Sequence, residues 1–278
     1  MSLEKRDYRI RTEHVERSDE SRSLGKGDFG TVERADIVTR VLRENDLGEW
    51  RVERERVHPD EFVTKTFHRE TAIEDARHSV ECYNELRAAG VQHIPGTHRV
   101  SDADPRVVIS TFLGKDSLLI TTNSVPEREK RPVEIDDASF VAMLADLKDD
   151  LDKIAACHRL IAHEDAIFFE LQMNGEVAEH VDFVFADFDN VTKASEASVE
   201  QISQNNLIQA TRSLFWLMMS QRVIPGADPT NDNWARIGSH IQLWADSLGV
   251  DTHKVHDDYV EELRARIAKD AAEREKGE

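Results

Sequence analysis

The chain has 278 residues, 39% of them hydrophobic, which is enough apolar material for one large domain or two lobes around a shared cleft. Its 55 acidic residues outnumber the 36 basic ones. The resulting net charge of -19 argues against a general nucleic-acid-binding protein, because the field of the whole molecule would repel a polyanion. Cys82 and Cys157 are far apart, so we expect neither a zinc site nor a disulfide framework.

The first half of the sequence favours strands and one helix. Residues 1–23 are polar and are interpreted as a strand-forming or loosely held lead-in, and residues 45–59 as a charged hairpin turn or insertion. Residues 71–89 carry apolar positions at helical spacing, and Gly90 directly after them predicts where that helix ends. The expected strands are 31–42, 61–67, 107–114 and, as a strand or the start of a linker, 118–122.

The second half favours helices around one hairpin. Residues 123–132 are a charged, proline-bounded connection, and residues 136–160 repeat apolar side chains at steps of three and four, which predicts the strongest helix. Two largely apolar strands, 168–173 and 181–186, flank the turn residues Asn174-Gly175. From about residue 199 onward the chain is expected to be helical, over 202–219, 234–248 and 256–274.

The beginning of the sequence bears on where the protein is found. Its first twenty residues are charged throughout and lack the apolar core of a signal peptide. The most apolar stretches, 107–113 and 181–188, are too short to span a bilayer. We therefore expect a cytoplasmic protein in a reducing compartment, with no membrane partner.

A glycine-rich stretch, Leu24-Gly25-Lys26-Gly27-Asp28-Phe29-Gly30-Thr31-Val32, has the form G-x-G-x-F-G-x-V. Glycines let the backbone turn sharply and approach a phosphate closely, because no Cβ obstructs the anion. At the tip, Phe29 would shield the site from water, and Val32 would pack on an adenine. The alternative is a plain hairpin turn, since a glycine-rich motif alone is a weak signal. The candidate nucleotide-binding residues here are Leu24, Gly25, Gly27, Phe29, Gly30 and Val32.

Further motifs follow this loop in order: a strand lysine in Val63-Thr64-Lys65, a helical glutamate, His163-Glu164-Asp165, and Asp187-Phe188-Asp189. Together they resemble the protein-kinase-like fold over about residues 24–216. Glu164 replaces the arginine of the family's H-R-D, and Asp189 replaces the glycine of its D-F-G. The chain is therefore more similar to compact atypical kinases of microbes, such as RIO-like, lipopolysaccharide-kinase-like and aminoglycoside-phosphotransferase-like proteins.

The resemblance implies roles for several residues on the nucleotide side. Lys65 matches the lysine of the family's V-A-I-K strand and would hold the α- and β-phosphates of ATP. A helix glutamate would orient this lysine; Glu81 is preferred, with Glu74 and Glu85 as alternatives. The backbone around Thr111 and Leu113 would hydrogen-bond adenine.

It also implies the residues of the catalytic step. Asp165 would accept or orient the substrate hydroxyl, and His163 would brace its loop. Asp187 would bind Mg²⁺, or Mn²⁺, that bridges the phosphates. The family's H-R-D-x-x-x-x-N places an Asn five residues after the catalytic Asp, and Glu170 occupies that position here. Glu170 either holds a metal or marks the loss of the second metal site.

The resulting expectation is an α+β, two-lobed kinase-like fold. A β-rich N-lobe with one main helix would span 1–113, and a helical C-lobe would span 114–278. Its function would be ATP- and Mg²⁺-dependent transfer of the γ-phosphate to a hydroxyl, of a protein Ser/Thr or of a sugar-type small molecule. Two hypotheses stay open beside it: a pseudokinase that acts as a nucleotide-binding or scaffold module, and an α+β protein whose glycine loop is only a hairpin.

Overall fold

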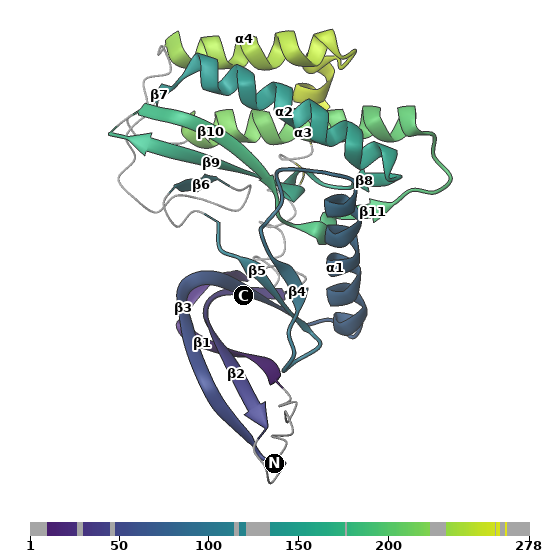
Figure 1. Ribbon diagram of the computed structural model, residues 1–278. Coiled ribbons are helices and arrows are strands. Elements are labelled where there is room, and N and C mark those ends of the chain that lie inside the picture. Colours follow the sequence, from purple (N-terminus) through teal and green to yellow (C-terminus); the bar gives the residue numbers. More distant parts are fainter. Residues whose placement is uncertain are drawn as a thin grey trace, which may run out of the picture. The chain divides into compact units, whose positions relative to one another are not determined.

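The computed structural model describes residues 10–26, 30–44, 48–113, 117–120, 134–175, 177–222, 232–258, 260–261 and 265. Over these residues the chain is a mixed α+β protein, which confirms the broad fold class predicted from the sequence (Figure 1). It divides into two compact units. Unit 1 comprises Met1–Glu81 and Pro95–Lys115, and unit 2 comprises Cys82–Ile94 and Asp116–Glu278.

The division differs from the expected one in one long segment and, at the boundary near residue 114, by two residues. The sequence placed Cys82–Ile94 in the N-lobe, whereas the structure groups it with unit 2. The reason is packing, because Cys82, Tyr83 and Leu86 are buried in the main hydrophobic core of that unit.

In unit 1, the described residues form one antiparallel sheet with strand order β1-β2-β3-β5-β4. The expected strand 31–42 is confirmed, but the strand predicted at 61–67 is far longer. Part of the segment interpreted as a turn or insertion, from Trp50 onward, belongs to it. The strands are β1 (Ile10–Lys26), β2 (Gly30–Glu44), β3 (Trp50–Phe67), β4 (His98–Val100) and β5 (Val107–Thr111).

Helix α1 (Ala72–Ala88) follows β3, as predicted. Its alanines Ala72 and Ala76 pack against Phe67 of β3 and Val108 of β5 on one face of the sheet. The helix ends at Ala88, and Gly90 shortly after it has a φ of +81°, a backbone conformation that costs glycine little. Beyond that glycine, the N–H of Val91 donates to the carbonyl of Leu86 at 3.1 Å and closes the helix end.

Unit 2 is built around the hairpin of β9 (Ile167–Asn174) and β10 (Val177–Phe185), at the site of the predicted turn. In the described residues, a four-stranded sheet has the order β6-β9-β10-β7, and β8 pairs with β11. The remaining elements are β6 (Leu118–Ile120), β7 (Glu134–Ile135), α2 (Asp137–Ala156), β8 (Arg159–Ile161), η1 (Glu164–Ala166), η2 (Phe188–Asn190), β11 (Val191–Lys193), α3 (Val199–Arg222) and α4 (Asp232–Ser247).

Helix α2 is the long helix expected from residue 136, and Asp136 caps it by accepting the N–H of Ser139 at 2.8 Å. The prediction ran too far at the other end, because the helix stops at Ala156 and Arg159–Ile161 forms β8. His158 between them has a φ of 54°, the left-handed backbone conformation that commonly follows the end of a helix.

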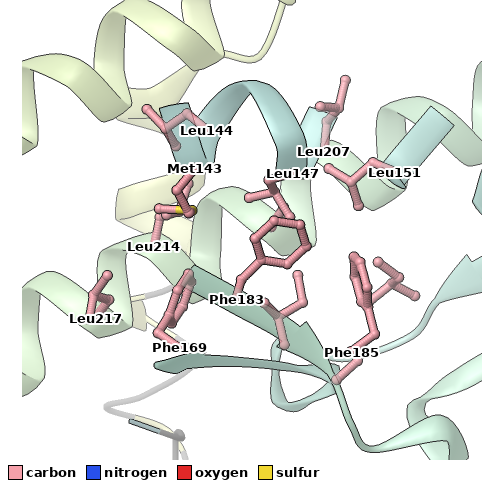
Figure 2. Close-up of a cluster of buried hydrophobic side chains, with 14 of the residues drawn as sticks. Met143, Leu144, Leu147, Leu151, Phe169, Phe183, Phe185, Leu207, Leu214 and Leu217 are labelled. Carbon is pink, nitrogen blue, oxygen red and sulfur yellow. The ribbon is translucent and has the colours of Figure 1, made fainter. Parts of the chain in front are cut away.

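The core of unit 2 lies between this hairpin and two helices, and Figure 2 shows it. Alternate residues of the hairpin point to one side, as the period of a strand requires. On that side, Phe169, Phe183 and Phe185 meet the apolar faces of α2 and α3. Truncating such a buried phenylalanine to alanine typically costs about 3–5 kcal/mol. This packing holds the hairpin in place, together with the turns η1 and η2 that adjoin its open end.

Two segments predicted from the sequence lie wholly or mostly outside the residues that the structure describes. The connection predicted at 123–132 lies outside the described residues, as does most of the helix predicted at 256–274. Among the residues that are described, no helix is both long and apolar enough to cross a membrane.

Candidate functional site

Two short turns adjoin at the open end of the β9–β10 hairpin. The last ladder pair is Ile167 with Phe185, and just beyond it the N–H of Ala186 donates to the carbonyl of Ala166 at 3.1 Å. On the other side, the N–H of Ala162 donates to the carbonyl of Asn190 at 2.7 Å. Turn η1 carries Asp165, and Asp187 is the residue that precedes turn η2. The structure thus brings these two predicted site residues into adjoining turns.

The two carboxylate oxygens of Asp165 have different surroundings. Nδ1 of His163 accepts the backbone N–H of Asp165 at 3.2 Å, and Oδ2 lies 3.1 Å from the same nitrogen, with which it forms an ion pair only when His163 is protonated. His163 therefore caps the turn, in agreement with the bracing role expected for it. The Oδ1 atom is buried and has no hydrogen-bond partner among the described residues. A buried acceptor of this kind is costly unless a ligand, water or proton satisfies it.

Asp187 leaves strand β10 at its C-terminal end. Its side chain caps no backbone N–H of η2, and its Oδ2 accepts a hydrogen bond from the Asn190 amide at 3.1 Å. Carboxylate oxygens are the donors that Mg²⁺ prefers, and this ion usually takes only one or two of them together with water and phosphate. Among the described residues, no cluster of three or more His, Cys, Asp and Glu could hold a metal on its own.

Glu170 does not join this pair. It lies in the middle of β9, opposite Asp182 of β10, and its Oε1 accepts a hydrogen bond from Ser117 at 3.2 Å. Glu170 is three positions along the strand from Ile167, which at the rise of a strand places it about 10 Å from the end of the ladder. Glu170 therefore lies away from the turns that carry Asp165 and Asp187, and the metal-binding role that the resemblance gave it stays a prediction. Counting five residues assumed a loop after Asp165, whereas the strand begins at Ile167.

Helix α3 holds the segment that leads to Asp165. The buried amide of Asn206 accepts the N–H of Ile161 at 2.7 Å and donates to the carbonyl of Arg159 at 3.0 Å. About two turns further along α3, the hydroxyl of Ser213 donates to the carbonyl of Glu164 at 2.9 Å. Sequence reasoning missed these positioning residues. The available signal was the polar pair Asn205-Asn206 within an otherwise apolar helical stretch.

In unit 1, Lys65 lies on the face of the sheet that α1 covers. It shares this face with Phe67, and it pairs across the ladder with Val32 of β2 and Val108 of β5. Its charge acts on His98, a buried residue that hydrogen-bonds Ser79 of α1 at 3.0 Å. Burial first, and then the Lys65 charge, lower the pKa of His98 to about 3. His98 is therefore neutral at physiological pH.

The helix carboxylate expected beside Lys65 is not found. Glu81 is exposed and forms no ion pair with any residue that the structure describes. The side of α1 that faces the sheet carries Ala76 and Ser79. Glu81 follows Ser79 by two residues, which places its side chain about 200° around the helix axis from that side. The alternatives do not replace it, since Glu74 is exposed and Glu85 binds Arg159 at 2.8 Å.

The glycine stretch is described in part. Gly25 pairs with Val32 across β1 and β2, while Gly27 and Phe29 lie outside the described residues. A Cβ on Gly30 would lie 2.3 Å from the carbonyl oxygen of Thr66, so close pairing with β3 requires glycine there, whether or not a nucleotide binds. The other predicted adenine-side residues are Leu24, 47% exposed, and the partly buried Thr111 and Leu113.

Comparison with known proteins adds no family to this picture: no protein-family model matches the chain, and no curated protein matches it.

Proposed function

We propose that the chain is an ATP- and Mg²⁺-dependent phosphotransferase that moves the γ-phosphate of ATP to a hydroxyl group. The observation that carries this proposal is the adjoining pair of turns with Asp165 and Asp187 at the end of one hairpin. An acidic pair there, one of whose buried oxygens lacks a partner, suits a reaction that needs a proton acceptor beside a metal ligand.

The order of elements supports a two-lobed kinase-like fold behind this chemistry. In unit 1, the strand lysine lies in the third strand of an antiparallel sheet, and α1 follows directly. In unit 2, the long helix, the His163–Asp165 turn, the hairpin and the Asp187 turn follow each other in the expected order. Strand β11 then pairs with β8, with Val191 opposite Ile161, so that the segments on the far side of the two turns are also joined to each other.

The proposed chemistry assigns one task to each of three side chains. Oδ1 of Asp165 would accept the proton of the acceptor hydroxyl, whose oxygen forms the new bond to the γ-phosphorus while the bond to the β,γ-bridging oxygen breaks and ADP leaves. Lys65 would hold the phosphates as a point charge. Asp187 would hold Mg²⁺, which would neutralise phosphate charge. The preferred acceptor is a protein Ser/Thr, with a sugar-type small molecule as the other candidate.

A nucleotide-binding module with little turnover is the second candidate, and two observations favour it. The segment between β8 and β9 is only Ala162–Ala166, which leaves no room for a second metal ligand at the family's spacing. In addition, Glu81 does not pair with Lys65. Both features would weaken the positioning of the triphosphate without preventing nucleotide binding.

ATP turnover separates the two candidates. We would measure ADP release with Mg²⁺ or Mn²⁺, with a generic Ser/Thr protein and with sugars as acceptors, for wild type, Asp165→Asn and Asp187→Asn. The phosphotransferase predicts that each variant loses at least about 100-fold in rate. The control, Asp146→Asn, removes an exposed carboxylate of α2 and should keep full activity.

A thermal-shift titration with ATP completes the test, because a ligand that binds only the folded state raises its stability. Stabilisation by ATP without turnover would favour the binding module. The absence of both, in a folded protein, would leave only the hypothesis that the glycine loop is a plain hairpin.

A further inference from the structure

Strand β3 has an unpaired outer half. Strand β5 pairs only with Phe62–Thr66, whereas β2 accompanies β3 along almost its full length, from Trp50 to Phe67. Figure 1 shows β1, β2 and β3 continuing together past the end of this β3–β5 ladder. Among the described residues, no strand lies on the other side of Trp50–His58. We call this stretch, with the backbone groups that point away from β2, the outer edge.

The outer edge exposes apolar side chains as well as backbone. Trp50, Val52 and Val57 are 39%, 52% and 46% exposed, and every residue between Arg51 and Val57 is exposed. An open strand edge presents a row of N–H and C=O groups that can template the pairing of another extended chain. Peptide-binding domains use this geometry, with backbone hydrogen bonds for affinity and side-chain contacts for specificity.

The charges along the outer edge do not cancel. Its two acids are engaged by arginines of β2: Glu55 binds Arg40 at 2.8 Å, and Glu53 binds Arg43 at 3.3 Å. Arg54 and Arg56 point to the same face, because residues two apart in a strand do. Their cross-strand neighbours are Val41 and Thr39, and neither arginine has an acidic partner among the described residues. An edge with two uncompensated positive charges thus lies on a chain whose net charge is -19.

The same charges disfavour a second copy of this chain as the occupant. An antiparallel pairing of two outer edges centred on residue 54 would place Arg54 opposite its own copy and Glu53 opposite Glu55. Shifting the centre between residues 53 and 54 would place Arg51 opposite Arg56. Shifting it between residues 54 and 55 would place Arg54 and Arg56 opposite Glu55 and Glu53, which Arg40 and Arg43 of β2 already bind. Like charges directly opposite each other destabilise a sheet. The occupant that fits is a different chain with acids opposite the arginines.

We propose that the outer edge of β3 binds an extended acidic segment of another protein by strand addition. Acidic side chains at positions i and i+2 of the segment lie opposite Arg54 and Arg56. The residue between them faces the side on which Glu55 is already paired, and an apolar residue next along packs on Val57. The recognised pattern is therefore two acids separated by one residue, with an apolar residue directly next to the acid opposite Arg56, all in an extended conformation. This binding site is independent of the proposed phosphotransferase activity.

Fluorescence anisotropy with defined peptides tests the proposal. The probe is an end-blocked, fluorescein-labelled nonapeptide that alternates glutamate and valine. One comparison peptide has lysine in place of glutamate, and another carries N-methyl groups on alternate residues, which removes the backbone donors. The protein variant is Arg54→Glu/Arg56→Glu. Its matched control, Arg77→Glu/Arg87→Glu, changes the net charge equally at exposed positions of α1. Circular dichroism verifies that all variants are folded.

The glutamate peptide should bind at least about tenfold more tightly than the lysine and N-methylated peptides, and added salt should weaken it. Arg54→Glu/Arg56→Glu should reverse the preference toward lysine, and the control should not. Equal binding of glutamate and lysine peptides, no binding at all, or an unchanged preference in the Arg54→Glu/Arg56→Glu variant would overturn the proposal. So would tighter binding of a single-stranded oligonucleotide, or a concentration-dependent dimer that this variant abolishes.

Discussion

Asp150 of α2 is a buried carboxylate with several hydrogen bonds, and its replacement gives a sharp test of how unit 2 is held together. It is 1% exposed, and it accepts the backbone N–H groups of Gln92 and His93 at 2.9 to 3.1 Å. Nδ1 of His93 lies 2.8 Å from it, and Lys153 donates to it at 3.1 Å. These contacts bind the segment after α1 to α2.

The pKa values of Asp150 and His93 set the size and pH range of the effect. Burial raises the pKa of Asp150, but the hydrogen bonds from His93, Gln92 and Lys153 outweigh it and lower the pKa from 3.8 to about 2. A shift of this size corresponds to about 2 kcal/mol of stability, present above pH 3.8 and lost as the pH falls through about 2. Burial lowers the pKa of His93, but Asp150 and Asp182 outweigh it and raise the pKa above 6.5. The contribution of His93 is complete below pH 6.5 and is lost as the pH rises through its folded-state pKa.

Urea denaturation of Asp150→Asn should therefore show a loss of about 2–3 kcal/mol near pH 6, because backbone donors and a protonated histidine lose their acceptor charge. The loss should shrink toward pH 9, where His93 is neutral. A double-mutant cycle should give a clear coupling between Asp150→Asn and His93→Gln. It should give a weaker one with Lys153→Met, since Lys153 also pairs with the exposed Asp149. A loss below about 0.5 kcal/mol, or one that is equal at pH 6 and pH 9, would refute this reasoning.

Three further predictions concern other parts of the chain. Asn206→Ala should cost about 2–4 kcal/mol in urea denaturation, because it leaves buried partners in β8 unsatisfied; Asn205→Ala removes one part-buried bond and should cost about 1 kcal/mol. Gly30→Ala should destabilise by about 2 kcal/mol or more in the same assay, whereas Gly96→Ala, whose Cβ meets nothing closer than 3.5 Å, should cost less than about 1 kcal/mol. Burial raises the pKa of the Cys82 thiol to about 12, so in a thiol-reagent assay at pH 8 Cys82 should react only after unfolding, and a fast reaction of both cysteines would contradict this.

The helices and the central hairpin could be predicted because their signals are local. Apolar residues at helical spacing and Gly90 define α1, and the turn Asn174-Gly175 between apolar runs defines the hairpin. The outer half of β3 could not be predicted, because Arg51–Val57 is exposed on both faces and so shows no alternation of polar and apolar residues. The end of α2 was missed because β8 continues the apolar pattern of the helix.

Short sequence motifs could predict the acidic residues of the candidate site, but not the contacts that position them. Asp165 and Asp187 were predicted from their resemblance to H-R-D and D-F-G and from their position beside the apolar strands of the hairpin, and the structure places them in adjoining turns. Glu170 lies away from these turns, because residue counting carries no information about where a strand begins. Glu81 was misplaced because the side of a helix that meets a sheet depends on tertiary packing. The supporting contacts of Asn206 and Ser213 join segments more than forty residues apart, and no local pattern encodes them.

The membership of Cys82–Ile94 in unit 2 has a practical consequence for dissecting this protein. A fragment cut at the apparent boundary, residues 114–278, would lack Tyr83, Leu86 and Val91, which are buried in the core of the remainder. The complementary fragment would carry these same apolar side chains with nothing to bury them. Neither half is therefore a self-contained piece for expression. Circular permutation, which keeps every residue, is the better route to separating the contributions of the two units.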